Sequence, residues 1–308
     1  MANLDQSPLQ GEALGLAWWN TSLSPNAKPG RAAAPDHAHA VDVLKAMIAS
    51  GVSVVGLAEI AVADVDELRK DPEIGAWLFT EAGRPVGKSR FDTCIAYDPA
   101  RFTLSEEKEV IGRRGRRRLK VAQHFAFDLS GGVGALHVFV SHWPSRLHLH
   151  QAAPDRLVYA GVLRGAIDGI LELDQSAQVV LMGDYNDEPF DNSMSYGLLA
   201  SREREYAVKK PGLLYNPFWR HMASIVHGGA CSPCSDKGTY YYAGGEIARW
   251  FMFDQMLFSQ SLLGIGGVWD LDDSLTRVYA ANGLVESVLR SKSIFDHLPV
   301  VAHLKRVK

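Results

Sequence analysis

Short apolar runs separated by polar breaks follow one another along most of the chain. Val, Ile, Leu, Phe and Trp dominate these runs, which predicts β-strands at residues 14–20, 52–60, 93–98, 119–129, 135–143, 178–186, 250–259 and 298–307. Helical spacing predicts helices at residues 37–50 and 155–173 and a short one at 191–199. Turn signals between successive runs favour antiparallel neighbours. The pattern predicts one α/β domain over residues 1–308, with largely antiparallel sheets and with residues 1–12 as a flexible N-terminal extension.

Composition and charge narrow the class of protein only slightly. The chain has 308 residues, of which 47% are hydrophobic and 22% charged, so it can bury a large core. Its formal net charge of −3 provides no global attraction for nucleic acid, so any such binding must come from a local patch.

Cysteine usage and the N-terminus favour a cytoplasmic protein without a membrane anchor. Three cysteines do not form a disulfide framework, and the odd count leaves one thiol unpaired within the chain. The first residues contain acids where a signal peptide has a basic region, and the chain contains no apolar run of the roughly 20 residues that cross a bilayer.

Polar residues stand at the ends of the predicted strands. They are Asn20, Glu59, His142, Asp184, Asn186, Asp254 within the seventh run, and Asp296 and His297 just before the eighth. Each alone is an ordinary turn residue, but Asp254 interrupts an apolar run, where an unpaired acid is costly, and His297 is a candidate partner. The segment M-G-D-Y-N-D-E-P at 182–189 holds three carboxylates after a buried run, which indicates pairing or a cation. We expect Asp187 and Glu188 to brace the turn at Pro189.

Seven short motifs occur in one order along nearly the whole chain: W-W-N at 18–20, L-A-E-I at 57–60, S-H-W-P-S-R at 141–146, M-G-D-Y-N-D-E-P at 182–189, G-T-Y-Y-Y at 238–242, F-D-Q-M-L-F-S at 253–259 and F-D-H-L-P-V at 295–300. In this order the chain resembles the endonuclease/exonuclease/phosphatase superfamily with the deoxyribonuclease-I-like fold, and most closely its bacterial nuclease branch. The resemblance implies a four-layered α/β/β/α sandwich of two mostly antiparallel sheets flanked by helices. It also implies metal-dependent cleavage of phosphate esters at one edge of the sheets.

The resemblance also implies roles for individual residues. Glu59, Asn20 and Asp296 would bind Mg²⁺, for which Mn²⁺ can substitute. Asp184 would orient or deprotonate the attacking water. On the predicted strand, Asn186 would point to the same side as Asp184 and donate its amide to the phosphate. His297, held by Asp254, and His142 would donate to the phosphate and the leaving group. No dense His/Cys cluster occurs among these positions, which argues against catalytic zinc.

One position departs from the family pattern. The final Asp-His pair usually follows a small hydroxyl residue, and here it follows Phe295. We expect this ring to narrow the cleft.

Substrate preference depends on weaker signals. Arg146 and the basic run at 112–120, which includes Arg116 and Arg118, suggest a track for a phosphate backbone, with a solvated basic hairpin as the alternative. Tyr241 could stack on bases, although core packing is the commoner fate of such aromatics. We expect a nuclease that acts on DNA more readily than on RNA. The alternatives are a phosphatase or phosphodiesterase for a small molecule or lipid headgroup, and a non-catalytic nucleic-acid-binding module on the same fold.

One further cluster lies outside the family motifs. His221, His227, Cys231 and Cys234 raise the question of structural zinc, but the histidine spacing is irregular and only one C-x-x-C pair exists. The sequence favours an ordinary loop with two reduced thiols.

Overall fold

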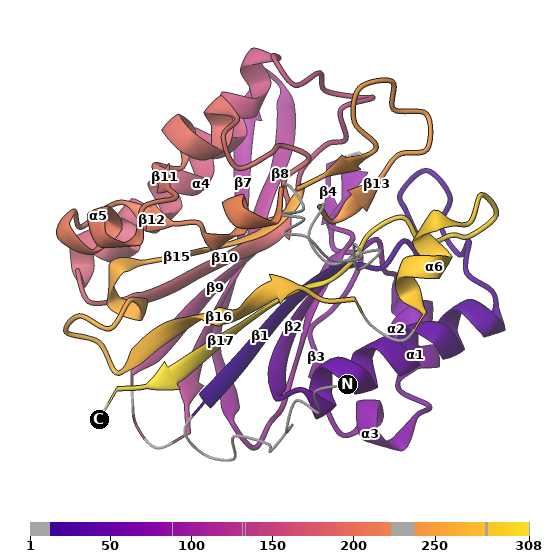
Figure 1. The fold of residues 1–308 in the computed structure, drawn as a ribbon, viewed down its shortest axis with the longest axis horizontal. Coiled ribbons are helices and arrows are strands. Elements are labelled where there is room, and N and C mark those ends of the chain that lie inside the picture. The colour runs from indigo at the N-terminus through magenta and orange to yellow at the C-terminus, as the bar shows by residue number, and fades with distance from the viewer. Residues whose placement is uncertain are drawn as a thin grey trace, which may run out of the picture.

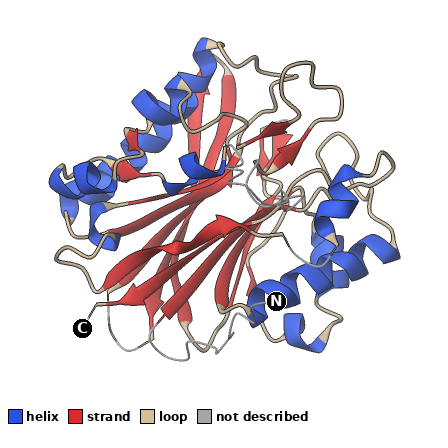
Figure 2. Ribbon diagram, viewed as in Figure 1, coloured by secondary structure: helices blue, strands red, loops and turns tan. Residues whose placement is uncertain are grey.

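Two β-sheets packed face to face form the centre of the molecule in the computed structural model (Figure 1). The structure describes residues 13–87, 89–130, 132, 134–222, 238–280 and 283–307. The predicted N-terminal extension, residues 1–12, lies outside these ranges. Helices lie on the outer side of each sheet, which gives four layers (Figure 2). The predicted α/β/β/α sandwich is confirmed.

The first sheet has six strands in the described residues. Their spatial order is β16 (Trp269–Val278), β17 (Val300–Arg306), β1 (Ala13–Asn20), β2 (Val52–Ala58), β6 (Thr93–Tyr97) and β3 (Leu78–Phe79). β1 and β2 are parallel, whereas β1 with β17 and β2 with β6 are antiparallel. α1 (Ala34–Ala49) lies on the outer face of this sheet. The helices near it are α2 (Val62–Leu68), α3 (Pro72–Gly75) and α6 (Leu284–Leu289).

The second sheet has seven strands in the described residues. Their order is β11 (Ala200–Ser201), β12 (Leu214–Tyr215), β15 (Asp254–Phe258), β10 (Gln178–Asp184), β9 (Ala135–His142), β8 (Arg117–Leu129) and β7 (Phe102–Arg114). β9 and β10 are parallel, and β15 is antiparallel to β10. Beside this sheet lie α4 (Pro154–Leu173), α5 (Arg204–Lys209) and the short turns η1 (Ser193–Gly197), η2 (Pro217–His221) and η3 (Gln260–Leu262).

Two small hairpins complete the architecture. They are β4 (Pro85–Val86) with β5 (Ser89–Arg90), and β13 (Tyr240–Tyr241) with β14 (Trp250–Phe251). The predicted strand at 250–259 is therefore wrong as one element, because it divides between β14 and β15 in different sheets. Asp254 begins β15 instead of lying in the middle of a strand.

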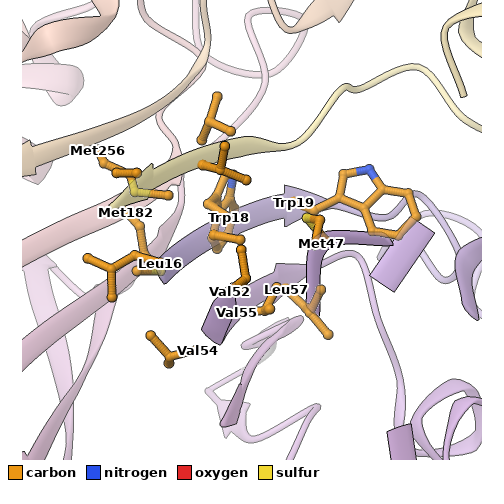
Figure 3. Close-up of a cluster of buried hydrophobic side chains, with 14 of the residues drawn as sticks. Leu16, Trp18, Trp19, Met47, Val52, Val54, Val55, Leu57, Met182 and Met256 are labelled. Carbon is orange, nitrogen blue, oxygen red and sulfur yellow. The ribbon is translucent and has the colours of Figure 1, made fainter. Parts of the chain in front are cut away.

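The alternation of side chains along β1 explains how the layers are held together. Trp18 points toward the second sheet, where Met182 and Met256 lie, while Trp19 points the other way, toward Met47 of α1 (Figure 3). Both tryptophans are fully buried. Successive residues of a strand face opposite sides, so the W-W pair fills the core between the sheets and the layer beneath α1.

Candidate active site

Strand direction brings four of the predicted residues to one edge of the six-stranded sheet. β1 ends at Asn20, and its parallel neighbour β2 is followed at once by Glu59. β17 runs antiparallel to β1, so the pair Asp296 and His297, just before β17, lies at the same edge. Residues that are far apart in the sequence therefore lie at the same edge of this sheet.

The seven-stranded sheet brings three more groups to its own edge. In the strand register, Asp184 lies directly opposite His142 on one side and Asp254 on the other. The Asn20 amide Nδ2 donates to Asp184 Oδ2 at 3.1 Å and so joins the edges of the two sheets.

His297 is held by a fully buried carboxylate. Its Nδ1 lies 2.7 Å from Asp254 Oδ2, and the other oxygen of Asp254 accepts a hydrogen bond from Trp18 Nε1 at 2.8 Å. Both carboxylate oxygens of Asp254 are therefore occupied, and the structure pairs the two residues as the sequence suggested. The ring of Tyr240 packs beside the imidazole, with centroids 4.7 Å apart.

His142 has a corresponding partner that sequence reasoning missed. Its Nδ1 lies 3.0 Å from Asp92 Oδ2, which also accepts from Asn26 Nδ2 at 2.8 Å. Lys120 Nζ lies 3.1 Å from the other oxygen of Asp92. Asp92 directly precedes β6, and β6 is antiparallel to β2, so the start of β6 lies at the same edge as the end of β2. An acid next to this strand end was therefore a signal that could have identified Asp92 from the sequence.

Asp184 lies between the two imidazole rings. Its Oδ2 is 3.8 Å from His142 Nε2 and 3.7 Å from His297 Nε2, distances that exceed a hydrogen bond. Both Nε2 atoms therefore remain available for another acceptor. The Oδ1 atom of Asp184 accepts the backbone N–H of Asn186 at 2.9 Å.

The neighbouring carboxylates keep both rings charged. Burial alone would lower the pKa of His142, but Asp92, followed by Asp184 and Glu59, raises it to about 9. Burial also opposes charge on His297, yet Asp254 and then Asp184 raise its pKa to about 10. Both histidines are thus imidazolium donors at neutral pH.

The acids of the site differ in their ease of ionisation. Burial, and then Asp254, raise the pKa of Asp184. Burial also raises the pKa of Glu59, and the nearby charge of Asp296 adds to this effect. Asp92 behaves differently: although burial opposes its charge, His142 and Lys120 hold its pKa below the ordinary value. Negative charge on Glu59 and Asp184 is therefore unfavourable in this structure.

Ser22 organises the opening of the site. Its hydroxyl donates to Asp296 Oδ1 at 2.5 Å, and its backbone N–H donates to Asn20 Oδ1 at 3.2 Å. The Phe295 ring, which we expected to narrow the cleft, instead stacks on Trp19 with centroids 5.9 Å apart and belongs to the core. That expectation is wrong because a hydroxyl from the β1 loop contacts Asp296 and leaves position 295 free to pack inward.

Backbone strain concentrates at this edge. In the described part of the chain four non-glycine residues have positive φ, and three of them are Ser22 (55°), Glu59 (51°) and Asn186 (51°). Such conformations cost about 1 to 3 kcal/mol each and persist where surrounding structure enforces them. The prediction that Asn186 continues an extended strand is wrong, because β10 ends at Asp184.

Arg146 and Asn186 contact protein groups. The Asn186 amide Nδ2 donates to the Trp143 carbonyl at 3.1 Å, which leaves its second N–H available. Arg146 Nε donates to the Asn186 carbonyl at 3.0 Å, and its terminal nitrogen lies 2.7 Å from Asp191 Oδ2. Arg146 therefore fixes the loop that carries Asn186, and its contact with substrate stays a prediction.

The remaining segment of M-G-D-Y-N-D-E-P is tied into the same loop. Asp187 is fully buried and bonds to the Ser193 hydroxyl, and burial raises its pKa to about 7 despite Arg156 at 3.4 Å. The backbone N–H of Glu188 donates to Asp191 Oδ2 at 2.8 Å. These contacts accord with a bracing role.

The other predicted substrate contacts are Tyr241, Arg116 and Arg118. The backbone N–H of Tyr241 donates to the Asp296 carbonyl at 3.0 Å, and its ring packs against Trp250. Arg116 and Arg118 are exposed on the hairpin between β7 and β8. Their role in binding stays a prediction.

The cysteine-rich loop is described only at its first member. His221 is buried, with Nε2 3.2 Å from the Thr276 carbonyl. His227, Cys231 and Cys234 lie outside the described residues, so the prediction about zinc at these positions stays a prediction. Cys94 is a free, buried thiol, and burial raises its pKa to about 12.

Two groups of side chains at this edge have the donors that a divalent cation requires. Ligand atoms of Asp184, Asp254 and His297 lie within 4.8 Å of one another. Asp254 already uses both oxygens, however, and His297 is charged. Glu59 has no hydrogen-bond donor on its carboxylate among the described residues, and its nearest cation is His142 Nε2 at 3.9 Å. Glu59 and Asp296 together therefore fit a hard, oxygen-bound cation better.

Family membership follows from the sequence profile of the endonuclease/exonuclease/phosphatase family, which matches residues 38–272. The chain belongs to this family of phosphoesterases, whose members depend on divalent metal. No curated protein sequence matches the chain. No described helix is long and apolar enough to cross a membrane.

Solved structures share the fold at low sequence identity. The human Nocturnin catalytic domain with bound sulfate superposes with a TM-score of 0.62 at 12% identity, covering 96% of this chain and 95% of that one. TDP2 from Caenorhabditis elegans gives 0.61 at 15%, covering 95% and 75%. A mannosyl-6-phosphatase from Bacteroides thetaiotaomicron gives 0.57 at 14%, covering 94% and 99%.

Proposed function

We propose that this protein is a divalent-metal-dependent nuclease that hydrolyses phosphodiester bonds of DNA. The observation that supports it best is the placement of the buried Asp184 between two charged imidazoles, beside the acidic pair Glu59 and Asp296. One edge thus combines a base, two donors and a cation-binding group, which are the requirements of phosphoester hydrolysis.

Glu59 and Asp296 would hold the cation, with the Asn20 amide next to them. Mg²⁺, or Mn²⁺ in its place, would when bound neutralise charge on a phosphate oxygen. Asn20 already donates to Asp184, so the same amide fixes the orientation of the base.

Asp184 takes the proton of the attacking water. The water oxygen forms the new bond to phosphorus in line with the ester oxygen, whose bond to phosphorus breaks. His297 Nε2–H and the second N–H of Asn186 donate to the non-bridging oxygens, and His142 gives its Nε2 proton to the departing oxygen. Asp254 and Asp92 favour the charged form of the two rings and fix their orientation through the bonds to Nδ1.

A substrate panel tests this function. Plasmid, linear duplex, single-stranded DNA and RNA are incubated with Mg²⁺ or Mn²⁺, with and without chelator, beside mannose 6-phosphate and a lipid-headgroup phosphate. We expect chelator-sensitive cleavage of DNA, and slower cleavage of RNA. Turnover of the small phosphates alone would replace the nuclease with a phosphatase, and DNA binding without any turnover would indicate a non-catalytic module.

A further inference from the structure

The hairpin between β7 and β8 is densely basic in an otherwise acidic chain. Within six positions it carries five exposed arginines: Arg113, Arg114, Arg116, Arg117 and Arg118. The formal net charge of the whole protein is −3, so this charge is local. Among the described strands of the seven-stranded sheet β7 is at the edge, and β8 lies between β7 and β9 (Figure 1).

The two faces of this hairpin have different surroundings. Leu119 is buried in the cluster beneath α4, so Arg117, two residues earlier, lies on the α4 face. Arg118 and Lys120 alternate with them and lie on the opposite face, where Lys120 reaches Asp92, the partner of His142. Arg113 is directly opposite Arg118 in the register and shares its face.

Each face of the hairpin has one ion pair, formed by Arg114 with Asp155 on the α4 face and by Lys120 with Asp92 on the other. The four remaining arginines have no ion pair among the described residues, and Arg113 opposes Arg118 across the strands on the face that leads to Asp92. Like charges directly opposite each other destabilise a β-ladder, so the chain retains an unfavourable arrangement beside its active site. Local arrangements that cost stability without compensation point to function.

We propose that Arg113 and Arg118, together with Arg116 in the turn between the two strands, bind the phosphate backbone of a nucleic acid strand that passes through the active site; these three residues are here called the arginine face. This rests on the proposed function, because the strand is bound on the way to His142. Arg118 lies two strand residues, about 7 Å, from Lys120, which corresponds to about two base-pair steps along the axis of a duplex. The substrate is thus an extended polyanion, and a single phosphate ester does not reach this surface.

Binding in the presence of chelator tests the arginine face without cleavage. A labelled 30-nucleotide DNA strand is titrated at several salt concentrations with the wild type and with Arg113→Gln/Arg118→Gln. We expect the double variant to bind at least tenfold more weakly, with a salt slope shallower by roughly 1.4, the loss for two phosphate contacts with a single strand. Its Tm should equal or exceed that of the wild type, because a repulsive pair is removed.

A matched control removes the same charge elsewhere. Arg117→Gln on the α4 face, combined with the distant exposed Arg69→Gln, should change affinity by less than threefold. Equal losses in the two variants, or tighter binding to phosphatidylserine vesicles than to the oligonucleotide, would overturn the proposal. If the Gln variant folds poorly, Arg113→Lys/Arg118→Lys replaces it: binding that survives with its salt slope supports the arginine face, and loss contradicts it.

Hydrolysis of a small phosphodiester distinguishes failure of the arginine face from failure of the proposed catalytic function. Hydrolysis of bis(p-nitrophenyl) phosphate with Mn²⁺ by the wild type tests the catalytic proposal without a polymeric substrate. Turnover with unaltered DNA affinity in the double variant would refute the arginine face alone. Absent turnover with the expected loss of DNA affinity in the double variant would refute the catalytic proposal and leave the arginine face in place.

Discussion

At the scale of single residues, each histidine of the site bonds to a buried carboxylate, but the two carboxylates have different second partners. Asp254 receives a neutral N–H from Trp18, whereas Asp92 also pairs with the cation Lys120. The charge of Asp92 is therefore shared between two cations. In both cases the carboxylate raises the pKa of the ring above its ordinary value, to about 10 for His297 and about 9 for His142.

Asp184 is the residue whose loss should affect turnover most specifically. Asp184→Asn keeps the shape of the side chain but cannot accept a proton, so we expect the rate of phosphoester cleavage to fall at least about a hundredfold. Steady-state kinetics with circular dichroism checks this. Glu188→Gln, in the same loop, serves as the control and should retain its rate. Undiminished turnover in Asp184→Asn would place the base elsewhere.

The pH profile should show the charge on His142. Because its folded pKa lies above the ordinary 6.5, the imidazolium persists at neutral pH and is lost as pH rises through about 9, so the rate should fall there. Asp92→Asn removes the main raising charge while burial remains, so the pKa of His142 should drop below 6.5. NMR titration of the ring measures this directly, and an unchanged pKa would show that Asp92 does not support the ring.

At the scale of elements, strand ends were predictable and their connections were not. β1, β2, β9 and β10 appear in the sequence as apolar runs, so the polar residues at their ends were visible. β7 was missed because its centre, S-E-E-K-E, is charged and its side chains are largely exposed at a sheet edge. The positive φ at Asn186 and the approach of Lys120 to Asp92 depend on packing between distant segments, which local patterns do not encode.

The outer face of the seven-stranded sheet should make the fold sensitive to acid. His124 on β8 lies with Nε2 3.0 Å from His137 Nδ1 on β9, and burial, followed by the charge of His137, lowers the pKa of His124 to about 4. Because the pKa of His124 is lower in the folded than in the unfolded state, it does not reduce the free energy of unfolding above pH 6.5. As the pH falls from 6.5 toward 4, the unfolded state binds the proton more readily and the protein loses stability. The loss should reach about 2 kcal/mol by pH 5.

Urea unfolding at pH 8 and pH 5 measures this effect. His124→Phe keeps the stacking on Phe139 but does not titrate, so it should lose about 2 kcal/mol less than the wild type over this interval. Equal losses in the two proteins would mean that other groups govern the acid sensitivity.

At the scale of the whole molecule, the site exists only where the two sheets meet. One sheet supplies Asn20, Glu59, Asp296 and His297, and the other supplies His142, Asp184 and Asp254. Trp18 belongs to the core between the sheets and also bonds to Asp254, so packing and chemistry share a residue. Burial disfavours negative charge on Glu59 and Asp184, and a divalent cation would offset this effect.

Binding of Mn²⁺, followed by electron paramagnetic resonance of the free ion, tests this account most directly. The wild type should bind one ion, Glu59→Gln should bind it at least about tenfold more weakly because a carboxylate ligand is lost, and Glu188→Gln should match the wild type. Undiminished Mn²⁺ affinity in Glu59→Gln, with loss only in Asp254→Asn, would contradict the account and assign the cation to Asp184, Asp254 and His297.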